Sequence, residues 1–419
     1  MKYSSIKGMS DIMPSEISAW QKLESTALEV FGLYGYLEIR TPIVEKTDLF
    51  VRGIGSNTMV VEKEMYSFKD ISDDMLSLRP EGTASVIRAY IESGAYQAEG
   101  IAKYVYIGPM FRRERPQKGR YRQFHQIGVE AIGLSDPLID AEQIAMGDFF
   151  FKKLGLSDFT TEINSLGCKK CRPEYNKVFG EFLKTKHARL CADCQRRILT
   201  NPLRAFDCKN PDCIAAIKEA PLIGSHLCKE CSDHFLSVQK RLNQLGTKFV
   251  VNHKIVRGLD YYMRTAFEYT TDKLGSQNAI AGGGRYDGLV HDLGGPNLPG
   301  VGFAIGMERV IMLMQASNLA AAAESDMVFF ALLGETAREK AIPVINSLRQ
   351  DGIKIELDYD GHSLKSQMRR ADKMAAHTVV IIGDEEVAKG KAVIRNMRTK
   401  EQEEVNIGDL ARHFVRIEV

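Results

Sequence analysis

The stretch IAKYVYIGPMFRRERPQKGRYRQFHQIGVE, residues 101–130, decides the fold around it. It begins as an aromatic and β-branched run, breaks at a Gly-Pro pair, and returns to alternating residues between Phe124 and Glu130. This pattern is typical of two strands joined by a long loop. The loop, residues 112–122, holds six Arg or Lys residues and one acid. Because guanidinium groups bind phosphate through paired hydrogen bonds, we expect this hairpin to contact a polyanion.

Length and composition indicate a folded protein of several domains. At 419 residues the chain is too long for one ordinary hydrophobic core, so we expect two or three domains. Its 44% hydrophobic and 26% charged residues are typical of globular proteins, and the net charge of +2 leaves any nucleic-acid contact to local patches. The sequence shows neither a signal peptide nor an apolar run that could span a bilayer. We therefore expect a cytoplasmic protein without membrane contact.

The rest of the chain divides into a longer and a shorter part. Strand-like and helical segments alternate over residues 326–419, which predicts an α/β domain with a mixed, largely parallel sheet. An alanine-rich stretch at residues 316–325 predicts a linker before it. The larger domain then covers residues 1–320. It is interrupted at residues 168–245 by a segment that holds every cysteine of the chain.

The eight cysteines fall into four close pairs. These pairs are Cys168/Cys171, Cys191/Cys194, Cys208/Cys213 and Cys228/Cys231. Without a signal peptide, metal binding is favoured over disulfides. Nineteen residues separate the first two pairs, a spacing within the zinc range, so we expect two structural zinc sites with four thiolates each. A nested pairing, outer with outer and inner with inner, is the alternative, as are a single occupied site and reduced structural cysteines.

Three arginines on separate segments are candidates for binding a triphosphate. Arg112, Arg257 and Arg309 each lie beside strand ends that contain glycine. If these segments converge, three guanidiniums could clamp a triphosphate and neutralise charge as pyrophosphate leaves. The spacing in the sequence is equally compatible with three unrelated surface arginines.

Polar residues among apolar neighbours form a second set of candidates. They are Glu81, Thr83, Gln126, Glu130, Tyr262 and Tyr286. Alternation places Gln126 and Glu130 on one face of a strand, and Gly128 between them would leave room for a small ligand. Because a buried acid needs a partner, these groups suit a cationic ligand such as an amino acid. Glu81 also precedes an expected helix, where the helix dipole stabilises an acid whatever its function.

Several long motifs in a fixed order resemble those of the histidyl-tRNA synthetases, a family of class II aminoacyl-tRNA synthetases. The motifs are KGMSDIMP (7–14), YGYLEIRTPIVEKTDLF (34–50), LRPEGT (78–83), GPMFRRERPQKGRYRQFHQIGVE (108–130), VRGLDYY (256–262), GGGRYDGL (282–289) and GFAIGMER (302–309). The resemblance covers nearly the whole chain, including the C-terminal domain, which is similar to the anticodon-binding domain of the family.

The resemblance implies an α+β catalytic domain built on an antiparallel sheet, and a homodimer formed through the segment at 34–50. It implies that histidine and ATP, with Mg²⁺ bound to the nucleotide, form a histidyl-adenylate, and that the histidyl group is then transferred to tRNA(His). The family usually carries a helical insertion where this chain has its cysteine-rich segment, so this segment departs from the pattern.

The resemblance also assigns roles to the candidate residues. Arg112 would bind the α-phosphate of ATP and Arg309 the γ-phosphate, with the adenine stacked near Phe124. Arg257 would stabilise charge at the α-phosphate during attack by the histidine carboxylate. Positioning and electrostatics would then supply the catalysis, without a protein nucleophile.

The same resemblance divides the histidine and tRNA contacts. Glu81, Thr83 and Gln126 would hold the α-amino group of histidine, and Glu130 and Tyr262 its imidazole, with Tyr286 lining the pocket. The basic loop would reach the acceptor end of tRNA through Gln117, Arg120 and Arg122. Two other functions remain open: a catalytically silent regulatory relative of the same fold, and a zinc-ribbon nucleic-acid module. The latter would account for only the middle of the chain.

Overall fold

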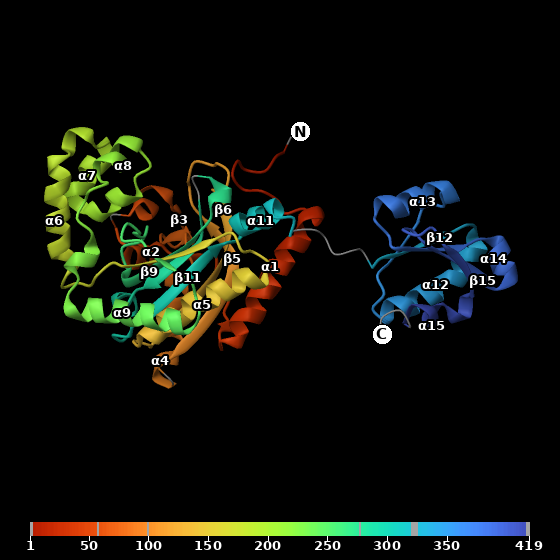
Figure 1. Ribbon diagram of the computed structural model, residues 1–419. Coiled ribbons are helices and arrows are strands. Elements are labelled where there is room, and N and C mark those ends of the chain that lie inside the picture. The colour runs from red at the N-terminus through yellow and green to blue at the C-terminus, as the bar shows by residue number, and fades with distance from the viewer. Residues whose placement is uncertain (1–2, 57, 99, 276–277, 320–325, 416–419) are drawn as a thin grey trace. The chain divides into compact units, whose positions relative to one another are not determined.

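The computed structural model describes residues 3–56, 58–98, 100–275, 278–319 and 326–415. The chain forms two compact units, Met1–Ala321 and Ala322–Val419, which Figure 1 draws as ribbons. Within the expected linker at 316–325, Ala316 ends helix α11 (Met307–Ala316), and residues 320–325 lie outside the described part.

An eight-stranded sheet forms the centre of the first unit. Its strand order is β1 (Leu37–Glu38), β5 (Ala102–Phe111), β6 (Gln123–Ile132), β11 (Gly300–Gly306), β10 (Ala279–Arg285), β9 (Met263–Thr270), β7 (Thr160–Ser165) and β8 (Val250–Val251). Neighbouring strands are antiparallel except at the two edges, where β1 pairs with β5 and β7 with β8 in parallel. The antiparallel catalytic-domain sheet implied by the resemblance is therefore confirmed.

The hairpin at residues 101–130 forms strands β5 and β6, as its alternation predicts. The two strands pair without a break from Ala102 opposite Ile132 to Phe111 opposite Gln123. The expected break at Gly108-Pro109 was wrong, because β5 continues through both residues. Strand β1 pairs with β5 only at Tyr104 and Val105, so beyond them β5 is an edge strand. Proline is tolerated there because its missing N–H faces no neighbouring strand.

Helices bury one face of this sheet. Helices α1 (Pro14–Leu33), α5 (Pro137–Lys153), α9 (Lys229–Gln244) and α11 supply apolar residues to the largest core cluster, together with β6, β9 and β11. Buried charges tie these layers together, because Arg285 of β10 pairs with Asp140 of α5, and His234 of α9 lies 3.2 Å from the same carboxylate. The other face of the sheet is left to form the site described below.

A smaller layer of short helices and a three-stranded sheet is formed mainly by residues 44–98. It consists of helix α2 (Thr47–Ile54), the helical turn η1 (Val60–Glu64), helices α3 (Thr83–Glu92), α4 (Ala95–Ala98) and α10 (Leu289–Asp292), and an antiparallel sheet of β2 (Val44–Lys46), β4 (Met75–Leu78) and β3 (Tyr66–Lys69). A short turn η5 (Asp272–Leu274) follows β9. The segment before α3 brings Glu81 to the sheet.

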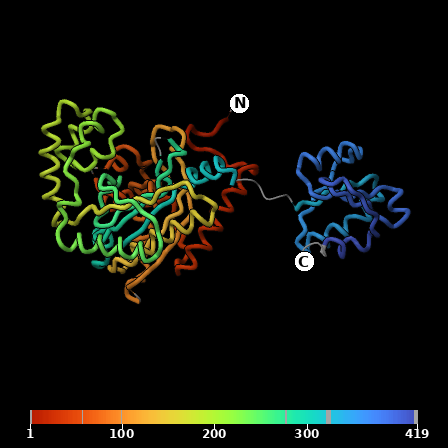
Figure 2. The backbone as a smooth tube through the Cα atoms, viewed as in Figure 1, coloured from red at the N-terminus to blue at the C-terminus, as the bar shows by residue number. Residues whose placement is uncertain are grey.

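The cysteine-rich segment is a helical insertion between the neighbouring strands β7 and β8, of which β8 forms the edge of the sheet. It comprises α6 (Arg172–Thr185), η2 (His187–Arg189), α7 (Ala192–Thr200), η3 (Pro202–Asp207), α8 (Pro211–Ala216), η4 (Ile223–His226) and α9. Figure 2 shows the chain leaving the sheet, running through this helical group and returning along α9. Its core is continuous with the domain, since one buried cluster contains Leu203 and Ala205 of the insertion together with Val256 and Tyr262.

The second unit is an α/β domain with a five-stranded mixed sheet. The strand order is β13 (Ile355–Leu357), β12 (Val328–Leu332), β14 (Thr378–Ile382), β15 (Lys391–Asn396) and β16 (Gln402–Asn406). The remaining elements are α12 (Glu335–Gln350), α13 (Leu364–Lys373), α14 (Asp384–Lys389), η6 (Ile407–Asp409) and α15 (Leu410–Val415). The sheet is parallel through β13, β12 and β14 but antiparallel through β15 and β16, so the expected parallel character holds for only half of its pairs.

Candidate active site

A cleft of about 580 Å³ lies against the open face of the large sheet. Nine of the predicted site residues line it: Glu81, Thr83, Arg112, Arg120, Phe124, Gln126, Arg257, Tyr262 and Arg309. Glu130, Tyr286, Gln117 and Arg122 are not among its lining residues. The structure therefore brings together segments that are far apart in the sequence, including all three candidate arginines.

Glu130 lies at the centre of a buried hydrogen-bond cluster. Its side chain accepts hydrogen bonds from Thr83 Oγ1 over 2.7 Å and from the Tyr286 hydroxyl over 2.5 Å. Burial raises the pKa of this carboxyl to about 8, against the opposing effect of the two donors. Gly302 on the neighbouring strand makes the space, because a Cβ there would lie 1.9 Å from the Glu130 carboxylate.

Gly128 does not leave room for a ligand, and that expectation was wrong. The ring of Tyr106 lies over Gly128, since a Cβ on this glycine would come within 2.0 Å of the ring. Gly82 contacts the same ring from the other side, where a Cβ would lie 2.2 Å away. Tyr106 itself is 3% exposed and lines the cleft. The two glycines therefore make the space for a buried tyrosine between the segment before α3 and strand β6.

Glu81 caps the start of helix α3. Its carboxylate accepts hydrogen bonds from the backbone N–H groups of Thr83 over 2.7 Å and of Ala84 over 2.8 Å. Burial raises its pKa, and these backbone donors oppose the shift. Gln126 contrasts with it, because its Oε1 atom is buried without a hydrogen-bond partner. An unpaired buried acceptor is costly, so this position suits a ligand that donates a hydrogen bond.

Arg112 is held at the base of the basic loop. Its Nε donates to the Pro80 carbonyl over 2.9 Å, and its guanidinium lies 5.3 Å from the centre of the Phe124 ring. This stacking leaves the arginine beside the aromatic face on which the adenine was expected.

Arg309 lies at the start of α11. It donates to the carbonyl of Gly119 over 3.0 Å and of Ala279 over 2.6 Å. Its pKa is lowered, first by burial and then by the charge of Arg120. Arg112 and Arg120 thus lie near Arg309, with Glu114 and Glu268 offsetting part of their charge, and the three arginines together favour a polyphosphate.

Arg257 belongs to the segment that leads into β9. It forms an ion pair with Glu268, and its guanidinium lies 5.4 Å from the centre of the Tyr262 ring. Burial alone lowers the pKa of Arg257, but Glu268 and Tyr262 outweigh it and raise the pKa above its usual value. The absence of a side chain at Gly282 is required here, because a Cβ would lie 2.7 Å from the guanidinium.

The tip of the basic loop is a closed turn. Gln117 and Arg120 exchange backbone hydrogen bonds of 3.1 and 2.8 Å, and the Arg120 guanidinium lies 3.2 Å from Glu114. Arg120 faces the cleft, whereas the Arg122 backbone N–H donates to the Gly8 carbonyl over 2.7 Å. Arg122 therefore fixes the N-terminal segment against the loop.

The cleft also contains residues that the sequence did not single out. Tyr106, Tyr261, Glu268 and Glu308 line it, as do Arg197, Arg204, Asp207 and Lys209 of the insertion. Tyr106 could have been found, because in the hairpin it lies opposite Gly128, between the candidates Gln126 and Glu130 of the partner strand. The sequence around Arg204 gives no such signal, because nothing in it indicates the contact with Gly258, more than 50 residues away.

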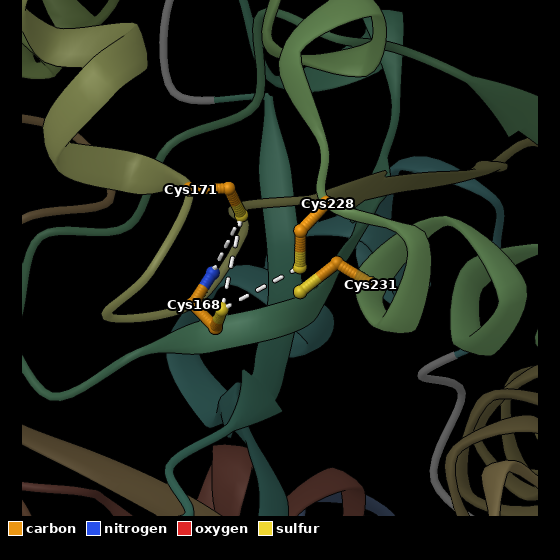
Figure 3. A group of neighbouring side chains, drawn as sticks. All are labelled: Cys168, Cys171, Cys228 and Cys231. Atoms are coloured by element: carbon orange, nitrogen blue, oxygen red, sulfur yellow. Dashed lines mark hydrogen bonds between the residues drawn. The ribbon is translucent and has the colours of Figure 1, made fainter.

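The eight cysteines form two groups of four, and the pairing is nested. One group is Cys168, Cys171, Cys228 and Cys231, and the other is Cys191, Cys194, Cys208 and Cys213. We call these the outer and the inner cluster. The expected pairing of consecutive pairs was wrong, and the nested alternative is found instead, because the segment just before α6 and the start of α9 place their cysteines together. Figure 3 shows the four sulfur atoms of the outer cluster converging.

The sulfur geometry fits a metal in both clusters. In each cluster the four sulfur atoms lie within 4.8 Å of one another. Cys168 Sγ lies 3.8 Å from the sulfurs of Cys171 and Cys228, and Cys191 Sγ lies 3.8 Å from Cys208 Sγ. Zinc–sulfur bonds of about 2.3 Å in a tetrahedron give sulfur–sulfur distances of about 3.8 Å.

Comparison with known proteins gives consistent matches along the chain. A family model described as histidyl-tRNA synthetase matches residues 8–310, and one described as anticodon binding domain matches residues 327–416. Histidine–tRNA ligases of Geobacter metallireducens and Geobacter sulfurreducens are 52% and 51% identical over 400 residues, which is 96% of each chain.

Solved structures agree with these matches. The apo histidyl-tRNA synthetase of S. aureus is 36% identical, has a TM-score of 0.82, and covers 98% of this chain and 99% of its own. An ATP phosphoribosyltransferase regulatory subunit/histidyl-tRNA synthetase from Bacillus halodurans C, 20% identical with a TM-score of 0.67, covers 91% of this chain and 99% of its own; this match shows the fold alone. Among the helices of the described residues, none has the length and apolar character needed to cross a membrane.

Proposed function

The chain belongs to the histidyl-tRNA synthetase family, and from this we infer that it ligates L-histidine to tRNA(His) with ATP. The observation that carries the inference is the match of 52% identity over 96% of the chain, joined to a cleft in which Arg112, Arg257 and Arg309 converge. In the first step the histidine carboxylate attacks the α-phosphorus of ATP and pyrophosphate leaves. In the second, a hydroxyl of the terminal tRNA ribose attacks the acyl carbon and AMP leaves.

For the nucleotide, ATP enters as its Mg²⁺ complex. Arg112 binds the α-phosphate and Arg309 the γ-phosphate, with the adenine near Phe124. The crowding of Arg120 and Arg309 supports this assignment, because a polyphosphate would relieve the repulsion between them. Arg257 stabilises the charge at the α-phosphate. No protein nucleophile takes part, so the arginines act by positioning and by electrostatic stabilisation.

For histidine, Glu81, Thr83 and Gln126 receive the α-amino group. The unpaired Oε1 of Gln126 supports this role, since an ammonium group would supply the missing donor. Glu130 and Tyr262 receive the imidazole, with Tyr286 fixing the Glu130 carboxylate. A histidine that binds through Glu130 has to share or replace the hydrogen bonds from Thr83 and Tyr286.

For tRNA, Gln117, Arg120 and Arg122 at the tip of the basic loop contact the acceptor end, and the unit beyond the linker binds the anticodon.

We also propose a homodimer through residues 34–50, where Leu37 is 68% and Ile43 42% exposed. Light scattering should then give twice the chain mass of 46.9 kDa. A cytoplasmic location fits a protein that uses ATP and tRNA and carries eight free cysteines.

The two cysteine clusters hold structural zinc. Both are closed four-thiolate groups, so they offer no open position for catalysis. Metal analysis of protein purified without chelator tests this, and two zinc ions per chain are expected from the two clusters. Protein with close to none would overturn the proposal.

Isotope exchange tests the activity itself. Pyrophosphate should exchange into ATP only when histidine is present. Exchange driven equally by another amino acid would refute the specificity. Histidine binding without any exchange would instead favour a regulatory relative of the same fold, a function that the fold match to the Bacillus halodurans protein permits.

A further inference from the structure

One wall of the active-site cleft belongs to the cysteine-rich insertion. Arg197 of α7, Arg204 and Asp207 of η3, and Lys209 line the cleft together with Arg257. All four insertion residues lie between the second and the last cysteine of the inner cluster. The position of this wall therefore depends on how the inner cluster is held.

Arg204 binds the segment at residues 256–262 directly. Its guanidinium donates to the Gly258 carbonyl over 2.8 Å and to Asp260 Oδ1 over 3.0 Å, and its side chain is only 11% exposed. Asn201 also donates to Asp260 Oδ1, over 3.2 Å. This segment carries Arg257 and Tyr262, so contacts at Gly258 and Asp260 fix the turn between two residues of the proposed active site.

Arg172 holds the other end of the same segment. It follows Cys171 of the outer cluster and donates to the Tyr262 carbonyl over 2.5 Å and to the Leu166 carbonyl over 2.9 Å. Burial lowers the pKa of its guanidinium. The segment is thus bound near its middle by an arginine beside the inner cluster and at its end by one beside the outer cluster.

The elements around Arg204 are short. Helix α7 has nine residues, η3 six and α8 six. Cys191 and Cys194 lie at the start of α7, Cys208 follows η3, and Cys213 is in α8, so one metal would join all three elements. Such a metal would add a cross-link to the packing of Leu203 and Ala205, which lie in one buried cluster with Val256 and Tyr262.

We propose that the inner cluster is a metal site whose role is to hold Arg204 against residues 256–262, and that Arg204 is thereby a positioning residue for histidine activation. The outer cluster does the same for Arg172. This proposal rests on the histidine-activating function and on the zinc sites proposed above. It adds that the insertion serves the first, tRNA-independent step of the reaction.

The test uses the full-length protein and measures pyrophosphate exchange, which needs no tRNA. Arg204→Ala should keep the metal content of the wild type but lower kcat/KM for histidine by about 10- to 100-fold, because displacing a substrate-positioning segment by about 1 Å has costs of this size. Arg204→Lys should recover part of the loss, since one of the two contacts can be remade. The KM for ATP should change less than the KM for histidine.

Arg196→Ala is the matched control, because Arg196 lies on the same helix, is exposed and contacts only Asp193 among the described ion pairs. It should exchange pyrophosphate like the wild type. Cys208→Ser should lose one metal ion and match the Arg204→Ala defect. If that variant does not fold, Arg204→Ala still tests the positioning role of Arg204, and the metal content of the wild type still tests the inner cluster.

The outcomes separate the two proposals. If the wild type shows no histidine-dependent exchange, the proposed function fails. If the wild type is active and Arg204→Ala equals it, Arg204 is not a positioning residue. If Arg204→Ala is impaired but the wild type contains no metal, the role of the inner cluster as a metal site is overturned.

Discussion

The hydroxyl of Tyr286 donates a hydrogen bond to Oε2 of Glu130 over 2.5 Å, while the other carboxylate oxygen accepts from Thr83 over 2.7 Å. Both oxygens of a fully buried acid are thus paired within the protein. Tyr286 follows the glycine-rich strand β10 and Thr83 begins helix α3, so Glu130 links these two elements. This arrangement has consequences for stability and for pH dependence.

The pH dependence of stability should reveal the buried proton on Glu130. Burial raises the pKa of Glu130 from 4.5 to about 8. Between these two pH values the folded protein keeps a proton on Glu130, whereas the unfolded chain has released it. The contribution of Glu130 to the free energy of unfolding is therefore fully present below pH 4.5. It is lost as the pH rises towards 8, by at most about 1.4 kcal/mol per pH unit.

Glu130→Gln, which keeps the shape without the titration, should gain stability relative to the wild type as the pH is raised. Thermal unfolding of both ligand-free proteins between pH 5.5 and 8.5 measures the difference. Parallel curves over this range would contradict the raised pKa.

Arg257→Ala should affect chemistry more than histidine binding. Arg257 is proposed to stabilise charge that develops at the α-phosphate, and removing one such group costs about 10²- to 10³-fold in kcat. Steady-state pyrophosphate exchange should therefore show a large loss in kcat with a smaller change in the KM for histidine. Arg52→Ala, an exposed position on α2, is the control and should be unaffected. Equal losses in kcat and in histidine affinity would refute the role of Arg257.

Gly302→Ala should damage the proposed histidine pocket through a single methyl group. The new Cβ would lie 1.9 Å from the Glu130 carboxylate and 2.5 Å from the Val129 carbonyl, so the strands or the acid must move. Overpacking of this kind typically costs about 1 to 3 kcal/mol. Calorimetry should show a lower Tm, and histidine binding should weaken. Gly180→Ala in helix α6 is the comparison: nothing lies within 4 Å of its Cβ, so its Tm should be unchanged or higher.

Arg285→Ala should be among the most destabilising substitutions in the domain. Arg285 is fully buried, pairs with Asp140 and Asp287, and donates to the Leu134 carbonyl over 2.6 Å. Removing one partner of a buried ion pair leaves the other charge unpaired, at a cost of about 3 to 5 kcal/mol. Urea unfolding measures this loss. Lys69→Ala removes an ion pair whose side chains are 64% and 83% exposed, and its unfolding midpoint should stay close to that of the wild type.

The sequence by itself predicted one hairpin of the large sheet and nine residues that line the cleft. Alternation over residues 101–130 was sufficient for β5 and β6, because side chains of a strand point to alternate faces whatever its neighbours are. The motifs around Arg112, Arg257 and Arg309 identified segments that the structure brings into one cleft. Local residue patterns carry this information, and the family resemblance supplied the order of the segments.

Only the tertiary structure decided which of these groups meet. The cysteine pairs are the plainest case, because each C-x2-C or C-x4-C unit is local, whereas its partner pair lies elsewhere in the chain and is chosen by the fold of the whole insertion. Likewise Tyr106, not a ligand, fills the space over Gly128, and Glu130 is buried behind Thr83 and Tyr286. Contacts of this kind depend on the distance between residues far apart in the chain, and no spacing in the sequence fixes that distance.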